Sequence, residues 1–271
     1  MIQLPALALE KRAARKLKDW QAEVNALASY AARVQAGKQR FKSRNTKRNA
    51  TFNHVKDVLS QMCQGARRCS YCEDSVADEV EHIMPKDLYP EGVFEWDNYL
   101  YACGPCNGPK NSEFAVLAGA PRKLVTVTRP DGAPVTSPQA GSPALINPRT
   151  EDPLHFLFLD LLNTFAFDVR NAPAVTDDDR LRADYTLRVL HLNDRDYLVK
   201  ARRTAFGTYR ARLGEYVTQK QNGAAQAILD RHRDELLEVG HQTVWREMQR
   251  QQAMYPVLKA LFDAAPEALA W

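Results

Sequence analysis

The interpretation of this chain starts from residues 69–114, which read CSYCEDSVADEVEHIMPKDLYPEGVFEWDNYLYACGPCNGPKNSEF. This stretch contains two C-x-x-C pairs, Cys69 with Cys72 and Cys103 with Cys106. Each pair is a tight turn whose thiolates converge, and four thiolates form the closed tetrahedral ligand set of a structural Zn²⁺ ion. Because no coordination position stays open, this metal is expected to hold the fold and to perform no chemistry.

A redox-active dithiol is the alternative interpretation of a C-x-x-C pair, but two pairs at knuckle spacing favour a metal site. Five cysteines in 271 residues are also too few for a disulfide scaffold. The fifth, Cys63, continues the apolar face of a helical pattern over residues 52–62 and is expected to lie in the core.

The residues between the cysteine pairs predict two strands and a helix. EVEHIMP, residues 79–85, is a short β-prone run that ends at a proline, and a second run extends from Trp96 to Tyr101. The second cysteine pair then opens a short helix that carries Asn107 and Lys110. The sequence therefore predicts a strand, a loop, a strand and a helix fastened by one zinc ion.

With these residues the chain resembles the HNH endonucleases, whose ββα-metal module carries C-x-x-C, (D/E)-H-I-x-P, W-x-N and C-x-x-C-(H/N)-x-x-K in this order. Further along, Ile146-Asn147-Pro148 and Asp152-Pro153 resemble the segment after the module in the retron- and Septu-associated HNH proteins, which accompany an ATPase in bacterial antiphage systems. The matching module positions are Cys69, Cys72, Glu81, His82, Pro85, Trp96, Asn98, Cys103, Cys106, Asn107 and Lys110.

The resemblance implies a role for each polar residue of the module. His82 is the expected general base, because imidazole titrates near about 6.5 and accepts a proton at neutral pH. Glu81 and Asn107 are expected to bind a catalytic Mg²⁺ or Mn²⁺ ion, which prefers hard oxygen ligands. Most relatives carry Asp where this chain has Glu81, which leaves the coordination there open. Asn98 is expected to brace the module and orient the base, with a simple Asx turn as the alternative. Lys110 is expected to face a phosphate.

Charge is distributed unevenly along the chain. The net charge of the chain is +4, but residues 1–60 hold 13 Lys and Arg against 4 Asp and Glu, whereas residues 61–115 hold 4 against 10. The acidic module therefore needs basic residues elsewhere to bind nucleic acid. The expected phosphate contacts, with a solvated loop as the alternative, are Lys38, Arg40, Lys42, Arg44, Lys47 and Arg48.

Apolar spacing predicts helices on both sides of the module. One is expected over residues 9–34, with Gly37 as its stop, and three more over residues 181–190, 197–217 and 224–248, followed by a short tail. Between them, a stretch rich in proline and glycine suppresses helix and predicts a hairpin that turns at Pro130-Asp131-Gly132.

The predicted fold class is α+β, mostly α-helical, with the HNH module embedded between N-terminal helices and a C-terminal helical region. Four parts are expected: a basic helical region (residues 1–64), the module (65–115), a Pro/Gly-rich connector (116–148) and the C-terminal helical region (149–271). In the last part, apolar residues are expected to form an internal core rather than a partner groove; they are Leu229, Leu236, Leu237, Val244, Trp245 and Met248.

The composition excludes several classes of protein. Hydrophobic residues make up 45% and charged residues 26% of the chain, ordinary values for a folded globular protein. No apolar run approaches the roughly 18 residues of a membrane span, and the N-terminal charges follow the short apolar stretch, the reverse of a secretory signal. The sequence therefore predicts a cytoplasmic protein.

The leading hypothesis is a metal-dependent HNH endonuclease that hydrolyses DNA phosphodiester bonds in antiphage defence, with an ATPase partner. Action on RNA stays open, because phosphodiester chemistry alone does not choose the sugar. The alternative is a non-catalytic zinc-stapled module that binds nucleic acid or protein. The Glu81-His82 pair separates the two hypotheses, since a binding module needs neither residue.

Overall fold

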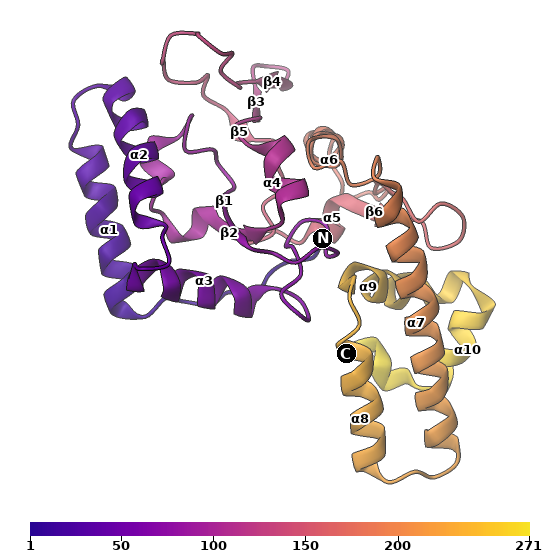
Figure 1. The fold of residues 1–271 in the computed structure, drawn as a ribbon. Coiled ribbons are helices and arrows are strands. Elements are labelled where there is room, and N and C mark those ends of the chain that lie inside the picture. The colour runs from indigo at the N-terminus through magenta and orange to yellow at the C-terminus, as the bar shows by residue number, and fades with distance from the viewer.

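The computed structural model describes residues 1–271 and confirms an α+β chain that is mostly helical (Figure 1). The helices are α1 (Lys11–Asn25), α2 (Tyr30–Arg44), α3 (Ala50–Met62), α4 (Gly104–Lys110), α5 (Pro153–Phe156), α6 (Asp177–Val189), α7 (Asp196–Gln221), α8 (Gln226–Leu237), α9 (Gln242–Gln251) and α10 (Pro256–Ala264). The strands are β1 (Glu79–His82), β2 (Tyr99–Ala102), β3 (Ala115–Ala118), β4 (Lys123–Thr126), β5 (Ser142–Pro143), β6 (Leu157–Leu159) and β7 (Phe167–Val169).

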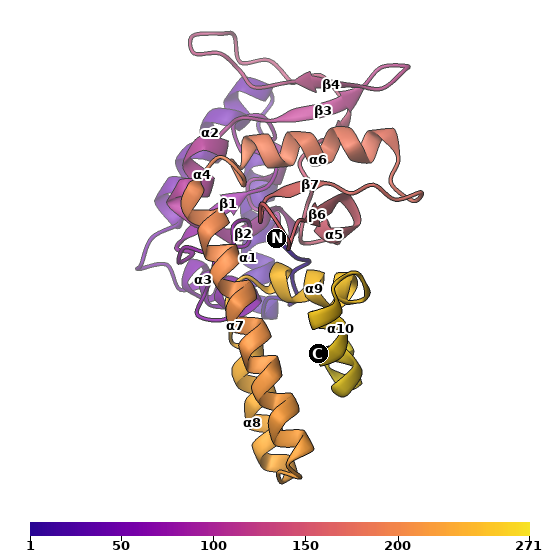
Figure 2. The same ribbon diagram turned by 90° about the vertical axis from the view of Figure 1, so that its right-hand side faces the viewer.

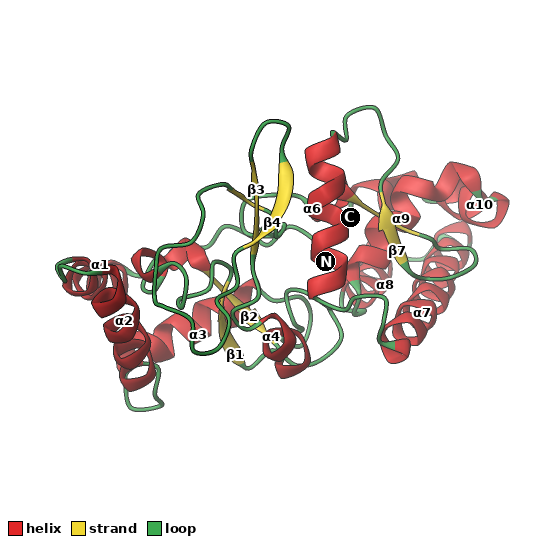
Figure 3. Cartoon of the chain, turned by 90° about the horizontal axis from the view of Figure 1, so that it is seen from above, coloured by secondary structure: helices red, strands yellow, loops and turns green.

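The elements follow one another across the molecule. Helices α1 to α3 lie at one end, α7 to α10 lie at the other, and β1, β2 and α4 lie between them (Figures 1 and 3). One hydrophobic core extends from Met1 near the start of the chain to Ala268 near its end. Helix α3 packs on β2, and both helical groups contribute side chains to the same core.

The N-terminal helices differ from the single predicted helix. Helix α1 ends at Asn25, and α2 begins after Ser29, whose hydroxyl caps it by accepting a backbone N–H at 3.1 Å. Helix α2 then passes through Gly37 and ends at Arg44, so the predicted stop at Gly37 is wrong. A Cβ atom on Gly37 would lie 3.0 Å from a methyl group of Val93. Glycine is present here because the helix packs closely on another segment.

Strands β1 and β2 pair antiparallel, with Glu79 opposite Ala102 and His82 opposite Tyr99. Helix α4 follows directly, which confirms the predicted order of strand, loop, strand and helix. The second strand is shorter than predicted, because its first residues form a 3-10 turn, Trp96–Asn98. Side chains alternate along β1, so Glu79 and Glu81 face α4 while His82 faces α2.

The predicted hairpin at Pro130-Asp131-Gly132 is wrong. The hairpin is formed earlier, by β3 and β4, with Gly119 at a φ of +86° in the connection between them. Residues Leu124 and Val125 pair there with the preceding strand, so they are not free to pair with the residues after Gly132. Strand β5 pairs with the other edge of β3, and Figure 2 shows this small sheet above α6.

Helices α7 and α8 form an antiparallel hairpin that projects from the rest of the molecule (Figure 2). The helix predicted over residues 224–248 is two helices, because His241, between α8 and α9, adopts a left-handed φ of +58°. The core assignment is confirmed for Leu229, Leu236, Val244, Trp245 and Met248, which are buried, whereas Leu237 is partly buried. None of the helices combines the length and apolar character that a membrane crossing needs.

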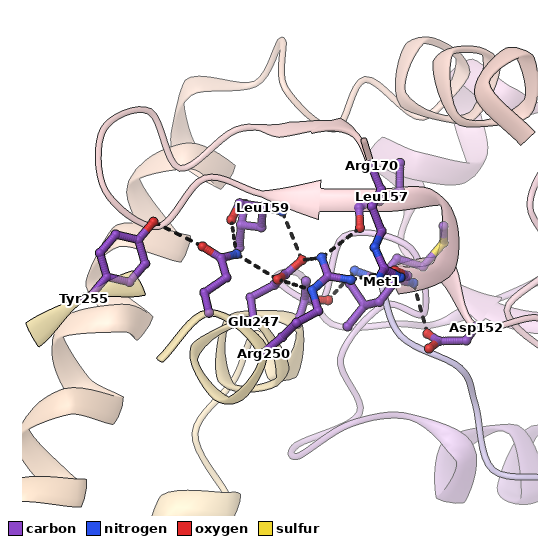
Figure 4. Close-up of polar contacts among 11 residues, drawn as sticks. Met1, Asp152, Leu157, Leu159, Arg170, Glu247, Arg250 and Tyr255 are labelled. Carbon is purple, nitrogen blue, oxygen red and sulfur yellow. Dashed lines mark hydrogen bonds and ion pairs between the residues drawn. The ribbon is translucent and has the colours of Figure 1, made fainter. Parts of the chain in front are cut away.

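Helix α9 is attached to β6 by a buried polar network (Figure 4). Gln251 donates to the carbonyl of Leu159 at 2.8 Å, and Arg250 donates to the carbonyl of Leu157 at 3.1 Å. Glu247 accepts the N–H of Leu159 at 3.1 Å and is neutralised by Arg250. The last helices are therefore held to the chain that follows the module by hydrogen bonds as well as by apolar packing.

Candidate metal centre and active site

The four paired cysteines fit a structural zinc ion. All four are buried, and their sulfur atoms lie within 4.8 Å of one another. The Sγ atoms of Cys72 and Cys103 are 3.8 Å apart. A tetrahedron with Zn–S distances of about 2.3 Å has S–S edges of roughly 3.8 Å, which is the separation found here. The ligand set predicted from the spacing is thus brought together by the fold.

Two local structures place these sulfur atoms. Cys69 and Cys72 lie in the turn after a β-bridge between Arg68 and Val76, where the N–H of Tyr71 points at Cys69 Sγ from 3.4 Å. Cys103 and Cys106 flank the start of α4, directly after β2. The zinc site therefore joins the turn before β1 to the end of β2 and the start of α4.

Arg195 belongs to the surroundings of this site, although sequence reasoning missed it. Its guanidinium Nη2 lies 3.2 Å from Cys106 Sγ and 2.9 Å from the carbonyl of Leu190. A zinc ion with four thiolates carries a net charge of −2, and a guanidinium in contact with one sulfur offsets part of it. No local signal identifies this residue, because 89 positions separate it from Cys106.

His82 is held as a neutral imidazole. Only 2% of it is exposed, and its Nε2 lies 3.0 Å from the carbonyl oxygen of Val93. A carbonyl only accepts, so Nε2 carries the proton and Nδ1, which makes no hydrogen bond, keeps its lone pair. Burial lowers the pKa of His82 to about 3, with the Lys86 ammonium acting in the same direction. The ring is covered edge-on by Phe41 of α2, at a centroid distance of 4.5 Å.

Lys110 does not face the surface, contrary to the expectation that it meets a phosphate. Its ammonium is fully buried, pairs with the Glu81 carboxylate and donates to the carbonyl of His82 at 2.9 Å. Burial raises the pKa of Glu81, and the charge of Lys110 opposes that change. Both side chains point into the interface between β1 and α4, which removes the lysine from solvent.

Asn107 meets a different carboxylate from the one expected. Its amide nitrogen donates to Glu79 Oε2 at 2.5 Å, while Glu81 is neutralised by Lys110. Apart from the cysteines, no three His, Cys, Asp or Glu side chains converge on one point. As arranged, the pair of Glu81 and Asn107 does not fit a divalent ion, because a lysine ammonium already occupies the carboxylate.

Asn98 has the geometry of a bracing residue. Its side-chain oxygen accepts the N–H of Met84 at 2.7 Å, and its amide nitrogen donates to the carbonyls of Met84 at 3.0 Å and Gly92 at 2.9 Å. These bonds join the chain after β1 to the loop of residues 90–94, below called the Val93 loop. Asn98 acts across the loop rather than as a local Asx turn.

The basic run is largely helical, since α2 extends to Arg44. Half of its members are paired: Lys38 with Asp87 at 2.6 Å, and Arg40 and Arg44 with Glu23 at 3.2 and 2.6 Å. The members that make no ion pair are Lys42, Lys47 and Arg48. The free positive charge is therefore smaller than the composition suggested and lies at the end of α2 and just after it.

Arg149 fastens the segment after the connector to the module. It donates to the carbonyl of Tyr99 at 2.8 Å, pairs with Asp97 at 3.0 Å and lies 4.5 Å from the ring centre of Trp96. This residue follows Ile146-Asn147-Pro148, so the downstream stretch that resembles the antiphage proteins contacts the module directly.

Gln21 and Tyr99 complete the surroundings of His82, and both were missed from sequence. The Tyr99 hydroxyl donates to the same Val93 carbonyl at 2.5 Å, and Gln21 binds the backbone on both sides of Val93. The sequence does contain a signal for Gln21, since it is a polar residue between Leu17 and Val24 on the apolar face of α1.

Comparison with known proteins finds a local similarity to a defence protein. Over 64 residues the chain is 41% identical to the Septu protein PtuB of Bacillus thuringiensis. The match covers 22% of this chain and 24% of PtuB, so the chain spans about a quarter of that relative's length. No family model matches the sequence, and no solved structure is significantly similar to it.

Proposed function

We propose that this protein is an HNH-type endonuclease that hydrolyses DNA phosphodiester bonds in antiphage defence. The observation that carries the proposal is His82, whose Nδ1 keeps a free lone pair while Nε2 is held by a backbone carbonyl. A histidine fixed in this way presents a proton acceptor to water, the first requirement of hydrolysis, and its basicity rises toward that of a free imidazole when the buried ring is exposed to solvent. The similarity to the Septu protein PtuB supports the place in defence.

The catalytic ion is part of this proposal, as Mg²⁺ or Mn²⁺ bound by Glu81 and Asn107. Binding there would require Lys110 to leave Glu81, because the ammonium already neutralises this buried carboxylate. The free energy of unfolding tests directly whether an ion can replace Lys110 at Glu81.

Replacing Lys110 by methionine is expected to destabilise the protein by about 3–5 kcal/mol, because the buried Glu81 carboxylate loses its counter-ion. Urea unfolding measures the loss. The double variant Glu81→Gln/Lys110→Met serves as control and is expected to recover most of the stability. If Glu81 is an ion ligand, Mn²⁺ stabilises the single variant and leaves the control unchanged. Equal stability of Lys110→Met and wild type contradicts the pairing.

The His82 side chain is almost entirely buried in this structure. Phe41 packs edge-on against the ring, and we infer that α2 shifts to admit a phosphodiester to Nδ1. A nuclease whose base is buried in this way would act only after Phe41 moves away from His82. We propose that the partner is an ATPase, as in the resembled antiphage systems.

The second candidate function, a non-catalytic binding module, is favoured by the same cover and by the neutralised Glu81. The deciding experiment incubates the purified protein with plasmid DNA or RNA in Mg²⁺ or Mn²⁺, with and without the proposed ATPase partner. Cleavage of DNA supports the endonuclease. Cleavage of RNA alone would show that RNA is the substrate, and binding without any cleavage supports the non-catalytic binding module. Full cleavage by the chain alone, with no complex formed, removes the case for a controlling ATPase.

The unpaired basic residues are proposed to contact phosphates. Changing Lys42, Lys47 and Arg48 together to glutamine is expected to weaken binding to all DNA sequences and to lower the salt slope by roughly 0.9 for each lost contact. Fluorescence anisotropy of a labelled duplex at several salt concentrations measures the slope. The matched control changes Lys38 and Arg40, which are already paired with acids, and is expected to have a smaller effect. An unchanged slope in the triple variant assigns the run to a solvated surface.

A further inference from the structure

One backbone carbonyl is the partner of two side chains at the candidate active site. The oxygen of Val93 accepts the Tyr99 hydroxyl at 2.5 Å and His82 Nε2 at 3.0 Å. The direction of this carbonyl decides which nitrogen of His82 carries the proton. A carbonyl turned away would leave the Nδ1–H and Nε2–H forms without a fixed preference, because neutral imidazole adopts both.

The Val93 loop is too short to fix that direction by itself. It consists of the 3-10 turn Pro90–Gly92 followed by Val93 and Phe94, with no strand partner along it. Asn98 holds one point, the carbonyl of Gly92. Besides the backbone bonds of the turn and the two donors to the Val93 carbonyl, the polar contacts of this loop come from the N-terminal helix α1.

Gln21 of α1 binds the loop on both sides of Val93. Its amide nitrogen donates to the carbonyl of Pro90 at 2.9 Å, and its oxygen accepts the N–H of Phe94 at 2.8 Å. The same nitrogen also donates to the Asn25 side chain at 2.9 Å. Only 3% of Gln21 is exposed, although it stands on an otherwise apolar helix face. A polar group is retained there because it satisfies two buried backbone groups of the loop.

We propose that Gln21 is a positioning residue for His82, acting through the Val93 carbonyl to hold the imidazole in the Nε2–H form. This inference rests on the proposed function, in which the free Nδ1 takes the proton from water. Gln21 touches neither His82 nor a substrate. Its effect is transmitted by two hydrogen bonds: one holds the N–H of the Val93–Phe94 peptide, whose carbonyl faces His82, and the other anchors the start of the loop at Pro90. Helix α1 thereby becomes part of the candidate active site.

The test is the tautomer of His82, read from long-range ¹H–¹⁵N NMR couplings of the imidazole in the full-length zinc-loaded protein. Wild type is expected to show the Nε2–H form alone. Gln21→Met keeps the side-chain length and loses both loop contacts, so it is expected to show a mixture of the two forms. A pure Nε2–H form in Gln21→Met overturns the proposal.

A matched variant separates positioning from general loss of stability. Gln251→Met removes an equally buried amide, on α9, that donates to the carbonyl of Leu159. It is expected to lower the unfolding midpoint while leaving the His82 tautomer and kcat unchanged. The same tautomer mixture in Gln251→Met would show that any destabilisation produces the effect, and the proposal would fail.

The activity measurement determines whether the variant changes kcat or KM. Gln21→Met is expected to lower kcat about tenfold to a hundredfold with KM unchanged, because an ill-placed base slows proton transfer without altering phosphate contacts. Gln21→Leu, which also loses both loop contacts, tests the same positioning if Gln21→Met does not fold. A pure Nε2–H form in Gln21→Leu would likewise overturn the proposal. Wild type that cuts no nucleic acid refutes the nuclease function, while the NMR result still decides the positioning.

Discussion

Cys103→Ser is expected to unfold or aggregate the central module. The two strands next to the zinc site have four residues each, and α4 has seven. Elements this short give the module little structure of its own without the metal. Binding of structural zinc is worth on the order of 10 kcal/mol of folding free energy, comparable with the whole stability of a typical domain. Cys103 is 2% exposed and joins β2 to α4, so its loss affects both elements.

Zinc content, measured by mass spectrometry, and circular dichroism check this result. Cys63→Ser is the matched control, because Cys63 is half-buried and lies outside the cluster. It is expected to retain both zinc and fold. A Cys103→Ser protein that folds with the zinc stoichiometry of wild type would show that the four-cysteine assignment is wrong.

His82→Ala is expected to abolish cleavage while leaving zinc bound. Loss of a general base typically costs 10²- to 10⁴-fold in rate, and here no other histidine contacts the Val93 carbonyl. The zinc ligands do not include His82, so metal content is expected to stay at the wild-type level. Because the ring is buried between Phe41 and Tyr99, some loss of stability accompanies the change.

The measurement is single-turnover cleavage of plasmid DNA at a temperature where both proteins are folded. His232→Ala, on the projecting helix α8, is the control and is expected to cleave like wild type. Cleavage by His82→Ala at the wild-type rate would show that another residue is the general base. If neither wild type nor His82→Ala cleaves under any of the ion and partner conditions above, the binding module is favoured.

The sequence by itself determined the features that depend on residues close together in the chain. The spacing of the two cysteine pairs and the runs between them predicted a four-sulfur site, two strands and a short helix, and all are present. Such predictions succeed because knuckle geometry and strand propensity act over a few residues. The long apolar stripes of the C-terminal region predicted buried positions for the same reason.

Only the tertiary structure decided the environment of the candidate catalytic residues. Gly37 was predicted to end a helix, but contact with Val93 accounts for the glycine and the helix continues. Lys110 was expected at a phosphate, but the Glu81 carboxylate on a neighbouring strand withdraws it from solvent. Arg195 contacts Cys106, 89 positions away, and Gln21 contacts Phe94, 73 positions away. Burial and charge pairing between distant segments are properties of the folded chain, and local spacing carries no record of them.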